Sequence, residues 1–272
     1  MGVILSFVSI KGGVGKTTLA LETASSLANH FNKRVLLVDA NFSAPNVGLY
    51  LDLTSDIGLH EVLDDGRRMH TAIYEAHGFD ILPALLYPFN GEPDVFKLKK
   101  LLDKMKQRYD FIIIDSSPNY NELIPVVAAS DKIFIVTTPD NMTLRTSLKA
   151  AVLAKKQKTP VEGIIINRIR NPKYELDLDN IEEESEMPVL ARIPDHKKMA
   201  ESLHFKKPLV LHDSKNSISK EIKRFASALV GSPEKPGFFE KLLGLTGFGK
   251  EVVNREIFRQ KLYESVMWDL SA

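Results

Sequence analysis

The sequence predicts an α/β fold: a doubly wound, mostly parallel sheet of about seven to eight strands with helices on both faces. Two patterns support this prediction. Short apolar runs alternate with segments of helical periodicity through residues 1–230. Several of the runs are continuously apolar, as in Phe111-Ile112-Ile113-Ile114, which is typical of strands buried on both faces of a parallel sheet. An amphipathic helical tail is expected after this domain.

Seven segments are expected to form the strands: Val3–Ser9, Arg34–Asp39, Phe79–Pro83, Tyr109–Asp115, Lys132–Thr137, Gly163–Asn167 and Val189–Ile193. Between them, apolar side chains recur at helical spacing in two stripes: Ala20, Ala24, Leu27, Ala28 and Phe31, then Leu98, Leu101, Leu102 and Met105. Two further helices are predicted over Met142–Lys158 and Ser217–Val230.

The composition changes at residue 231. Residues 231–237 read Gly-Ser-Pro-Glu-Lys-Pro-Gly, which predicts a linker. We therefore expect one globular domain over residues 1–230 and a helical tail over residues 238–272.

Composition and charge exclude several classes of protein. The formal net charge of +1 gives no global attraction to nucleic acid or membranes, so any such attraction must be local. The chain has no cysteine, which excludes disulfides and thiolate-bound metals or clusters. No apolar run is long enough to span a bilayer, and the apolar start lacks the basic region of a signal peptide.

A glycine-rich segment, Ser9–Thr18, lies between the first strand and the first helix. Glycines allow backbone N–H groups to curl around phosphates, and the free N–H groups of a helix start add partial positive charge. We expect Lys16 to reach the β- and γ-phosphates, Thr17 to ligate magnesium and Thr18 to contact the α-phosphate. The whole predicted phosphate loop is Lys11, Gly12, Gly13, Val14, Gly15, Lys16, Thr17 and Thr18, as in a P-loop NTPase.

Two apolar strands end in a carboxylate, Asp39 and Asp115. Ligands of parallel sheets bind beyond the carboxyl ends of the strands, where the phosphate loop also lies. Either aspartate alone would be interpreted as a turn or helix cap. Together with the loop, they predict a magnesium site made with Thr17.

The motif KGGVGKTT resembles the deviant Walker A motif of the MinD/ParA family of ATPases, and the resemblance covers roughly residues 1–230. It implies ATP or ADP with Mg²⁺ as cofactors. It also implies that Lys11 reaches across a dimer interface to the nucleotide of the partner, so that ATP controls dimerisation. By the same resemblance Asp115 is the Walker B aspartate, Asp39 opens switch I, and Asp115–Pro118 is switch II.

Switch I departs from the family pattern, which usually has a second aspartate two residues after the first. Asn41 stands there, and an amide hydrogen-bonds water but cannot accept its proton as a carboxylate does. Asn46 stands where the family has a switch asparagine. Lys11, Lys16, Asn41 and Asn46 are therefore the candidate catalytic residues, with two interpretations open: slow natural turnover, or an Asp→Asn replacement made to trap the ATP state.

The resemblance also places adenine between two loops that follow late strands. Asn167 offers a donor and an acceptor to the base, Arg168 can stack on it, and Pro194 and Asp195 form the other wall. The alternative for Asn167 is a cap at the strand end. No N-K-x-D motif of a GTPase is present.

The tail resembles the membrane-targeting helix of the MinD branch, with an apolar side formed by Phe238, Phe239, Leu242, Leu243 and Leu245. It departs from that branch because residues 251–272 follow and suggest a second amphipathic helix. The alternative is that both tail helices dock on the domain or pair with the tail of a partner.

These features predict a MinD-like ATPase that is cytoplasmic, dimerises with ATP and then binds the membrane reversibly, with an activating protein partner. The alternatives are a ParA-like partition ATPase whose dimer binds DNA, or a non-hydrolysing ATP-gated scaffold. The DNA alternative would use two basic runs: Lys97, Lys99, Lys100, Lys104, Lys106 and Arg108, then Lys155, Lys156 and Lys158.

Overall fold

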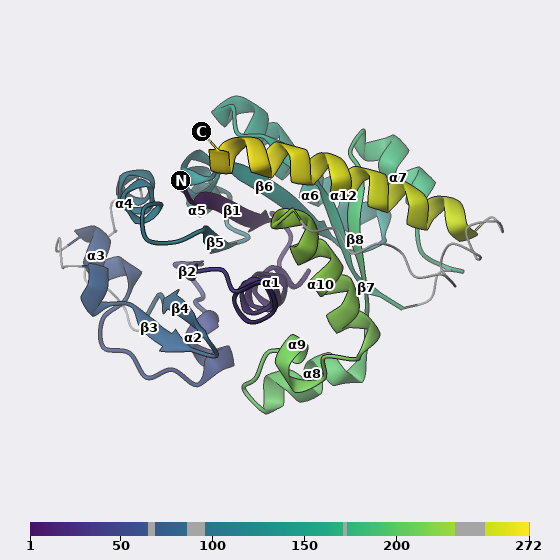
Figure 1. Ribbon diagram of the computed structural model, residues 1–272. Helices are drawn as coiled ribbons and strands as arrows, with labels where there is room; N and C mark the ends of the chain where they lie inside the picture. Colours follow the sequence, from purple (N-terminus) through teal and green to yellow (C-terminus); the bar gives the residue numbers. More distant parts are fainter. Residues whose placement is uncertain (65–68, 86–95, 171–172, 232–247, 272) are drawn as a thin grey trace.

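A computed structural model describes residues 1–64, 69–85, 96–170, 173–231 and 248–271. Its centre is one eight-stranded sheet in the order β3-β4-β2-β5-β1-β6-β7-β8 (Figure 1). Every neighbouring pair is parallel except β3 with β4. The predicted α/β fold with a doubly wound, mostly parallel sheet is confirmed.

The strands are β1 (Val3–Val8), β2 (Val35–Ala40), β3 (Tyr74–Ala76), β4 (Phe79–Leu82), β5 (Phe111–Ser116), β6 (Lys132–Thr137), β7 (Val161–Ile169) and β8 (Val189–Pro194). Seven of them overlap the seven predicted segments. The prediction missed β3, a three-residue antiparallel strand at the edge of the sheet. Its half-buried sequence Tyr-Glu-Ala has no apolar run that would mark a strand.

The longer helices are α1 (Lys16–Phe31), α4 (Lys97–Met105), α5 (Tyr120–Ala129), α6 (Asn141–Gln157), α7 (Leu178–Ser185), α8 (Lys197–His204), α10 (Ser217–Leu229) and α12 (Phe248–Ser271). The shorter ones are α2 (Val47–Leu51), α3 (Leu59–Asp64), α9 (Leu209–His212) and the 3₁₀ turn η1 (Met69–Thr71). The sequence predicted α1, α4, α6 and α10, and the second tail helix suggested over residues 251–272 is α12. It missed α5, α7 and α8; a proline inside a helix, here Pro125 of α5, argues against a helix in the sequence.

Alternate residues of each central strand face opposite layers, which explains the continuous apolar runs. In β1, Leu5 and Phe7 join the core beneath α1 and α10, whereas Ile4 packs in the layer of α3, α4 and α5. In β6, Ile133 and Ile135 pack with α5, α6 and α7. Helices therefore cover both faces, and the central strands β1, β2, β5 and β6 are fully buried between them.

The C-terminal helix α12 lies across the molecule against α10 and β8 (Figure 1). Leu262 and Val266 are buried in the core with α10. Arg259 is 1% exposed; its side chain donates to the Leu190 carbonyl at 2.9 Å and to the Glu221 carboxylate at 2.6 Å. Over residues 255–266, the docking alternative stated for the tail therefore holds.

The predicted apolar segment Phe238–Leu245 and most of the predicted linker lie outside the described residues. The boundaries at residues 230 and 238 stay predictions. Within the described part of the chain, no helix is both long enough and apolar enough to cross a bilayer.

Candidate nucleotide-binding site

The loop between β1 and α1 has the backbone of a phosphate cradle. Gly13 and Gly15 take left-handed conformations, with φ of 78° and 98°, which favour glycine. Gly15 is the residue before α1, and a Cβ on it would overlap the amide of Asn167. The N–H groups at the start of the 16-residue helix α1 thus open onto the loop, as an anion site requires.

Lys16 lies at the floor of this cradle and is 6% exposed. Its Nζ is 3.4 Å from the Lys11 carbonyl oxygen. Burial lowers the pKa of Lys16, and the charge of Asp115 acts in the opposite direction. Among the described residues, no carboxylate forms a close ion pair with Lys16, and a buried ammonium of this kind fits phosphate as its partner.

Two buried carboxylates face each other across neighbouring strands, because Asp39 of β2 pairs in register with Asp115 of β5. Burial and then the charge of Asp115 raise the pKa of Asp39 to about 8. Burial raises the pKa of Asp115 to about 6, against the lowering effects of Thr17 and Lys16. This pair disfavours two negative charges unless a cation joins it.

The residues fit magnesium. Among the described residues, neither oxygen of Asp115 has a hydrogen bond of good geometry, although both are fully buried. The Thr17 hydroxyl lies on the same side, since it acts on the pKa of Asp115. Mg²⁺ in proteins is bound through one or two carboxylates, phosphates and water, and the pair Asp39 and Asp115 provides such carboxylates.

Switch I is folded around Asp39. One Asp39 oxygen accepts from the Asn41 backbone N–H at 3.1 Å, and the other accepts from the N–H groups of Asn46 and Val47 at 3.0 Å each. The carboxylate therefore caps α2. Asn41 and Asn46 both donate their side-chain amides to the Ala44 carbonyl, at 2.5 and 2.7 Å.

Asn41 is 5% exposed, and its Oδ1 is buried without a hydrogen-bond partner among the described residues. Ser43, two residues on, donates its hydroxyl and its N–H to the Glu122 carboxylate of α5. The loop that carries Asn41 is thereby tied to the helix that follows switch II.

A second cleft, of about 360 Å³, adjoins the loop at the ends of β7 and β8. All four residues predicted to bind the base line it: Asn167, Arg168, Pro194 and Asp195. Asn167 is turned toward the phosphate loop, because its Nδ2 donates to the Val14 carbonyl at 2.7 Å. Among the described residues this is the one hydrogen bond recorded for the Asn167 side chain, so the predicted contact of its amide oxygen with a base stays a prediction. This bond joins the end of β7 to the phosphate loop, a contact that the sequence analysis did not predict either as a base contact or as a strand cap.

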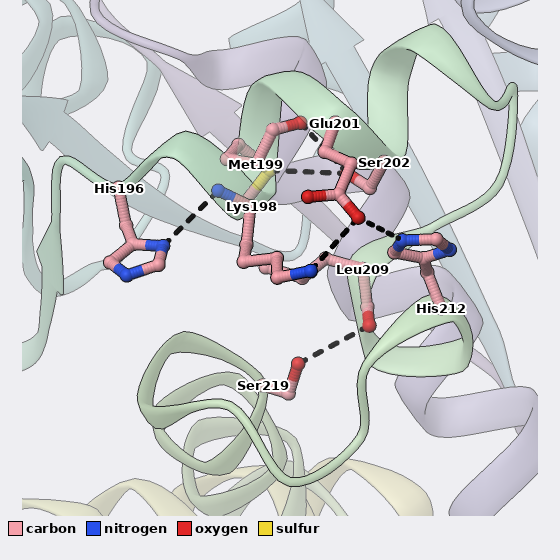
Figure 2. Close-up of polar contacts among 8 residues, drawn as sticks. All are labelled: His196, Lys198, Met199, Glu201, Ser202, Leu209, His212 and Ser219. Carbon is pink, nitrogen blue, oxygen red and sulfur yellow. Dashed lines mark hydrogen bonds and ion pairs between the residues drawn. The ribbon is translucent and has the colours of Figure 1, made fainter.

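One wall of this cleft is α8, through Met199, Ala200 and Leu203. Glu201 fixes that helix against α9, accepting from Lys198 at 2.9 Å and lying 3.2 Å from the His212 ring nitrogen (Figure 2). The Nδ1 of His196 accepts from the Lys198 N–H at 3.1 Å and caps the start of α8 (Figure 2).

Lys11 is exposed on the phosphate loop and does not line the base cleft, although the hollow that it lines shares Arg168 and Arg170 with that cleft. That hollow has a volume of about 300 Å³ and is also lined by Gly12, Gly13, Thr138 and Asp140. The predicted site residues thus divide into three adjoining parts: phosphate and metal, base, and rim.

The sequence analysis missed several residues of these surfaces, and three of them contribute large side chains to the base cleft. Tyr50 of α2 and Met199 of α8 line the base cleft. Arg170 also lines it and pairs with Asp195 at 2.7 Å. No sequence pattern marks them, because they come from separate elements. Only Arg170, two residues beyond Arg168, was near a predicted position.

The fold and this site define a phosphate-loop nucleotide-binding protein. Residues 5–209 match the CobQ/CobB/MinD/ParA nucleotide binding domain, and the chain belongs to that family. It is a MinD/ParA-type ATP-binding ATPase.

Named relatives agree with this assignment. An uncharacterised ATP-binding protein of Methanocaldococcus jannaschii is 30% identical over 236 residues, covering 85% of this chain and 89% of that protein. The septum site-determining protein MinD of Pyrococcus horikoshii, solved with Mg-ADP, is 25% identical with a TM-score of 0.75, covering 92% of this chain and 99% of that one. MinD in the MinC:MinD cell division complex of Aquifex aeolicus is 27% identical with a TM-score of 0.76, covering 87% and 98%.

Proposed function

We propose that this protein is a MinD-like switch that dimerises when it holds ATP and magnesium and releases its partner after hydrolysis. The observation that carries the proposal is the position of Lys11. Its side chain is exposed on the rim of the phosphate loop, whereas Lys16 of the same loop is buried beneath it. One lysine can serve the nucleotide of its own chain, and the other is available to a second copy.

The chemistry of the site supports the assigned cofactors. Lys16 and the α1 start would hold the phosphates, and Thr17, Asp39 and Asp115 would hold Mg²⁺, directly or through water. A bound Mg²⁺ would neutralise developing charge on the phosphates. The likeness to a MinD solved with Mg-ADP points to the same ligands.

Turnover is proposed to be slow because Asn41 replaces the usual aspartate of switch I. Its amide cannot take a proton from an attacking water. Its Nδ2 is also engaged by Ala44, which leaves only the buried Oδ1 free among the described contacts. ATP would then stay bound for a long time before it is hydrolysed, and the ATP-bound dimer would persist.

Membrane association is proposed to follow from dimerisation. Two copies of the segment Phe238–Leu245 would be presented together, and linked weak binders gain roughly 10²–10⁴ in apparent affinity. The protein would therefore be cytoplasmic with ADP and peripheral to the membrane with ATP. A protein partner that stimulates hydrolysis is part of this proposal; the MinC:MinD complex of a relative supports only that proteins of this kind bind a protein partner.

The test is the molar mass of the full chain in solution, measured by light scattering after size exclusion. With magnesium and a slowly hydrolysed ATP analogue, the 30.5 kDa chain is expected to double its mass, and with ADP to stay monomeric. Lys11→Ala should remain monomeric with the analogue while still binding it by calorimetry. Lys33→Ala, a half-buried lysine beyond the far end of α1 and so remote from the loop, is the matched control. A wild type that stays monomeric when saturated contradicts the proposal.

A further inference from the structure

The base cleft has a wall that comes from switch I rather than from the late strands. Tyr50 of α2 lines it together with Gly15 and Thr18 of the phosphate loop and Arg168 and Pro194 of the β7 and β8 ends. It is the only phenol or phenyl ring among the lining residues of this cleft. The charges of Asp115 and Arg168 both act on the pKa of its hydroxyl, which burial raises. The lining of the cleft places the Tyr50 side chain beside both the phosphate loop and the ends of β7 and β8.

The helix that carries Tyr50 is fixed at several points. Asp39 accepts from the N–H groups of Asn46 and Val47 at its start. Val47 and Leu51 are buried in the main core. Lys206, two residues after the end of α8, donates its ammonium to the Leu49 carbonyl at 2.9 Å and so joins α2 to that segment.

Because of these contacts the ring is positioned before any ligand arrives. A side chain whose backbone is already held loses little conformational freedom on binding, so its contact adds to affinity at low entropic cost.

The order of groups in a nucleotide shows what would reach Tyr50. The cleft begins at Gly15 and Thr18, where the phosphate nearest the sugar is expected, and continues toward Arg168 and Pro194. The group beyond that phosphate is the nucleoside. Aromatic side chains stack on bases, and the contact tolerates different bases because each has a π-face.

We propose that Tyr50 is a nucleotide-contacting residue, whose ring packs on the nucleoside of a purine nucleotide and closes the base cleft from the switch I side. The proposal rests on the proposed function only in taking a nucleotide as the ligand. It adds a residue that joins the helix after switch I to the base, and it does not require dimerisation.

The experiment compares binding of two ligands to the full chain by calorimetry, each with magnesium: ADP, which has a nucleoside, and inorganic tripolyphosphate, which has none. Tyr50→Leu is expected to weaken ADP binding roughly tenfold, the loss of one stacking contact. Tyr50→Phe should bind ADP within about twofold of wild type, since it keeps the ring. Binding of tripolyphosphate should be the same in all three proteins.

Leu49→Ala is the matched control, because it lies on the same helix and does not line the cleft. Equal urea midpoints for all variants establish that they fold. Tyr50→Leu binding ADP like wild type overturns the proposal, as does equal loss of both ligands. A wild type that binds no ADP overturns it together with the proposed function. If the wild type stays monomeric with the ATP analogue but its ADP binding depends on the Tyr50 ring, only the proposed function is contradicted.

Discussion

At the scale of single residues, the site consists of ionisable side chains whose burial is energetically unfavourable. Lys16 is buried and ready for phosphate, and Asp39 and Asp115 are buried side by side. Each of these would be destabilising in a protein without a ligand, since an unpaired buried charge costs several kcal/mol. Their clustering at the carboxyl ends of the central strands therefore indicates a binding site.

Asn41→Asp is expected to raise the rate of ATP hydrolysis at least about tenfold, because a carboxylate can accept the proton of the attacking water. The measurement is phosphate release at saturating ATP and magnesium. Asn121→Asp on α5 makes the same change of charge at an exposed position and should leave the rate as in wild type. An unchanged rate in Asn41→Asp would show that switch I does not limit turnover through this residue.

Glu22 gives a prediction about pH. It is fully buried on α1 and accepts from the backbone N–H groups of Leu209 and Val210 at 2.6 and 2.9 Å. Burial raises its pKa from 4.5 to about 7, against the lowering effect of those bonds. A carboxyl whose folded pKa is raised stabilises the fold fully below the unfolded pKa and loses that contribution as pH rises through the folded pKa.

The stability advantage of wild type over Glu22→Gln should therefore shrink between pH 4.5 and 7, by on the order of 3 kcal/mol. Urea unfolding at several pH values measures it. Glu201→Gln is the control of opposite sign, because Lys198 and then His212 lower the pKa of Glu201, so any contribution from Glu201 is lost as pH falls. An advantage of Glu22 that is constant across this range would mean that the carboxyl titrates normally.

At the scale of elements, α12 is the least expected part of the molecule. Its sequence reads as a second amphipathic helix, yet it lies on α10 and β8 with an arginine buried at the contact. Arg259 pairs with Glu221, and Glu221 also accepts from the Arg192 backbone N–H at 3.1 Å. The end of the chain is thereby joined to the strand whose last residue, Pro194, lines the base cleft.

Arg259→Leu should lower the free energy of unfolding by about 3–5 kcal/mol, because it leaves Glu221 charged and partly buried without its partner. Chemical denaturation of the full chain measures the change. Lys261→Leu, an exposed position of the same helix, should change stability by less than about 1 kcal/mol. Equal midpoints for Arg259→Leu and wild type would show that α12 is not docked in solution.

At the scale of the whole molecule, docking of α12 decides how the membrane proposal is tested. Removing everything after residue 230 would expose the apolar residues of α10 that share a core with Leu262. Substitutions in the tail are therefore the sharper choice. The pair Phe238→Ser with Leu242→Ser should reduce co-sedimentation with anionic liposomes at least about tenfold in the ATP-analogue state. Phe205→Ser, an apolar side chain 59% exposed on the domain, is the control.

The same assay with duplex DNA separates the two family branches. Binding to DNA that falls steeply with salt would favour the ParA-like alternative. The exposed lysines 99, 100 and 104 of α4 would be the surface to vary in that case. Lys106 is excluded from that surface because it pairs with Asp131 at 2.7 Å.

Much of this molecule could be predicted from local sequence, and the remainder could not for a physical reason. The phosphate loop and the buried strands are continuous in the chain, so spacing and composition reveal them. Tyr50 and Met199 meet only because α2 and α8 fold to the same cleft. In the sequence, nothing distinguishes Arg259 from an arginine on the surface; it is buried only because the fold packs it against β8 and α10. Contacts made between distant elements leave no pattern in a single sequence.

The cap that Asp39 places on α2 has a consequence for signalling. Its two oxygens serve three amide hydrogens, and these are the same oxygens that a divalent ion would claim. If the ion draws away the oxygen that accepts from Asn46 and Val47, the first turn of α2 loses its cap, and Tyr50 lies in the last turn of that five-residue helix. Asp39 alone would therefore couple binding of the ion to the contact between Tyr50 and the nucleoside, because it both binds the ion and holds the helix that carries Tyr50.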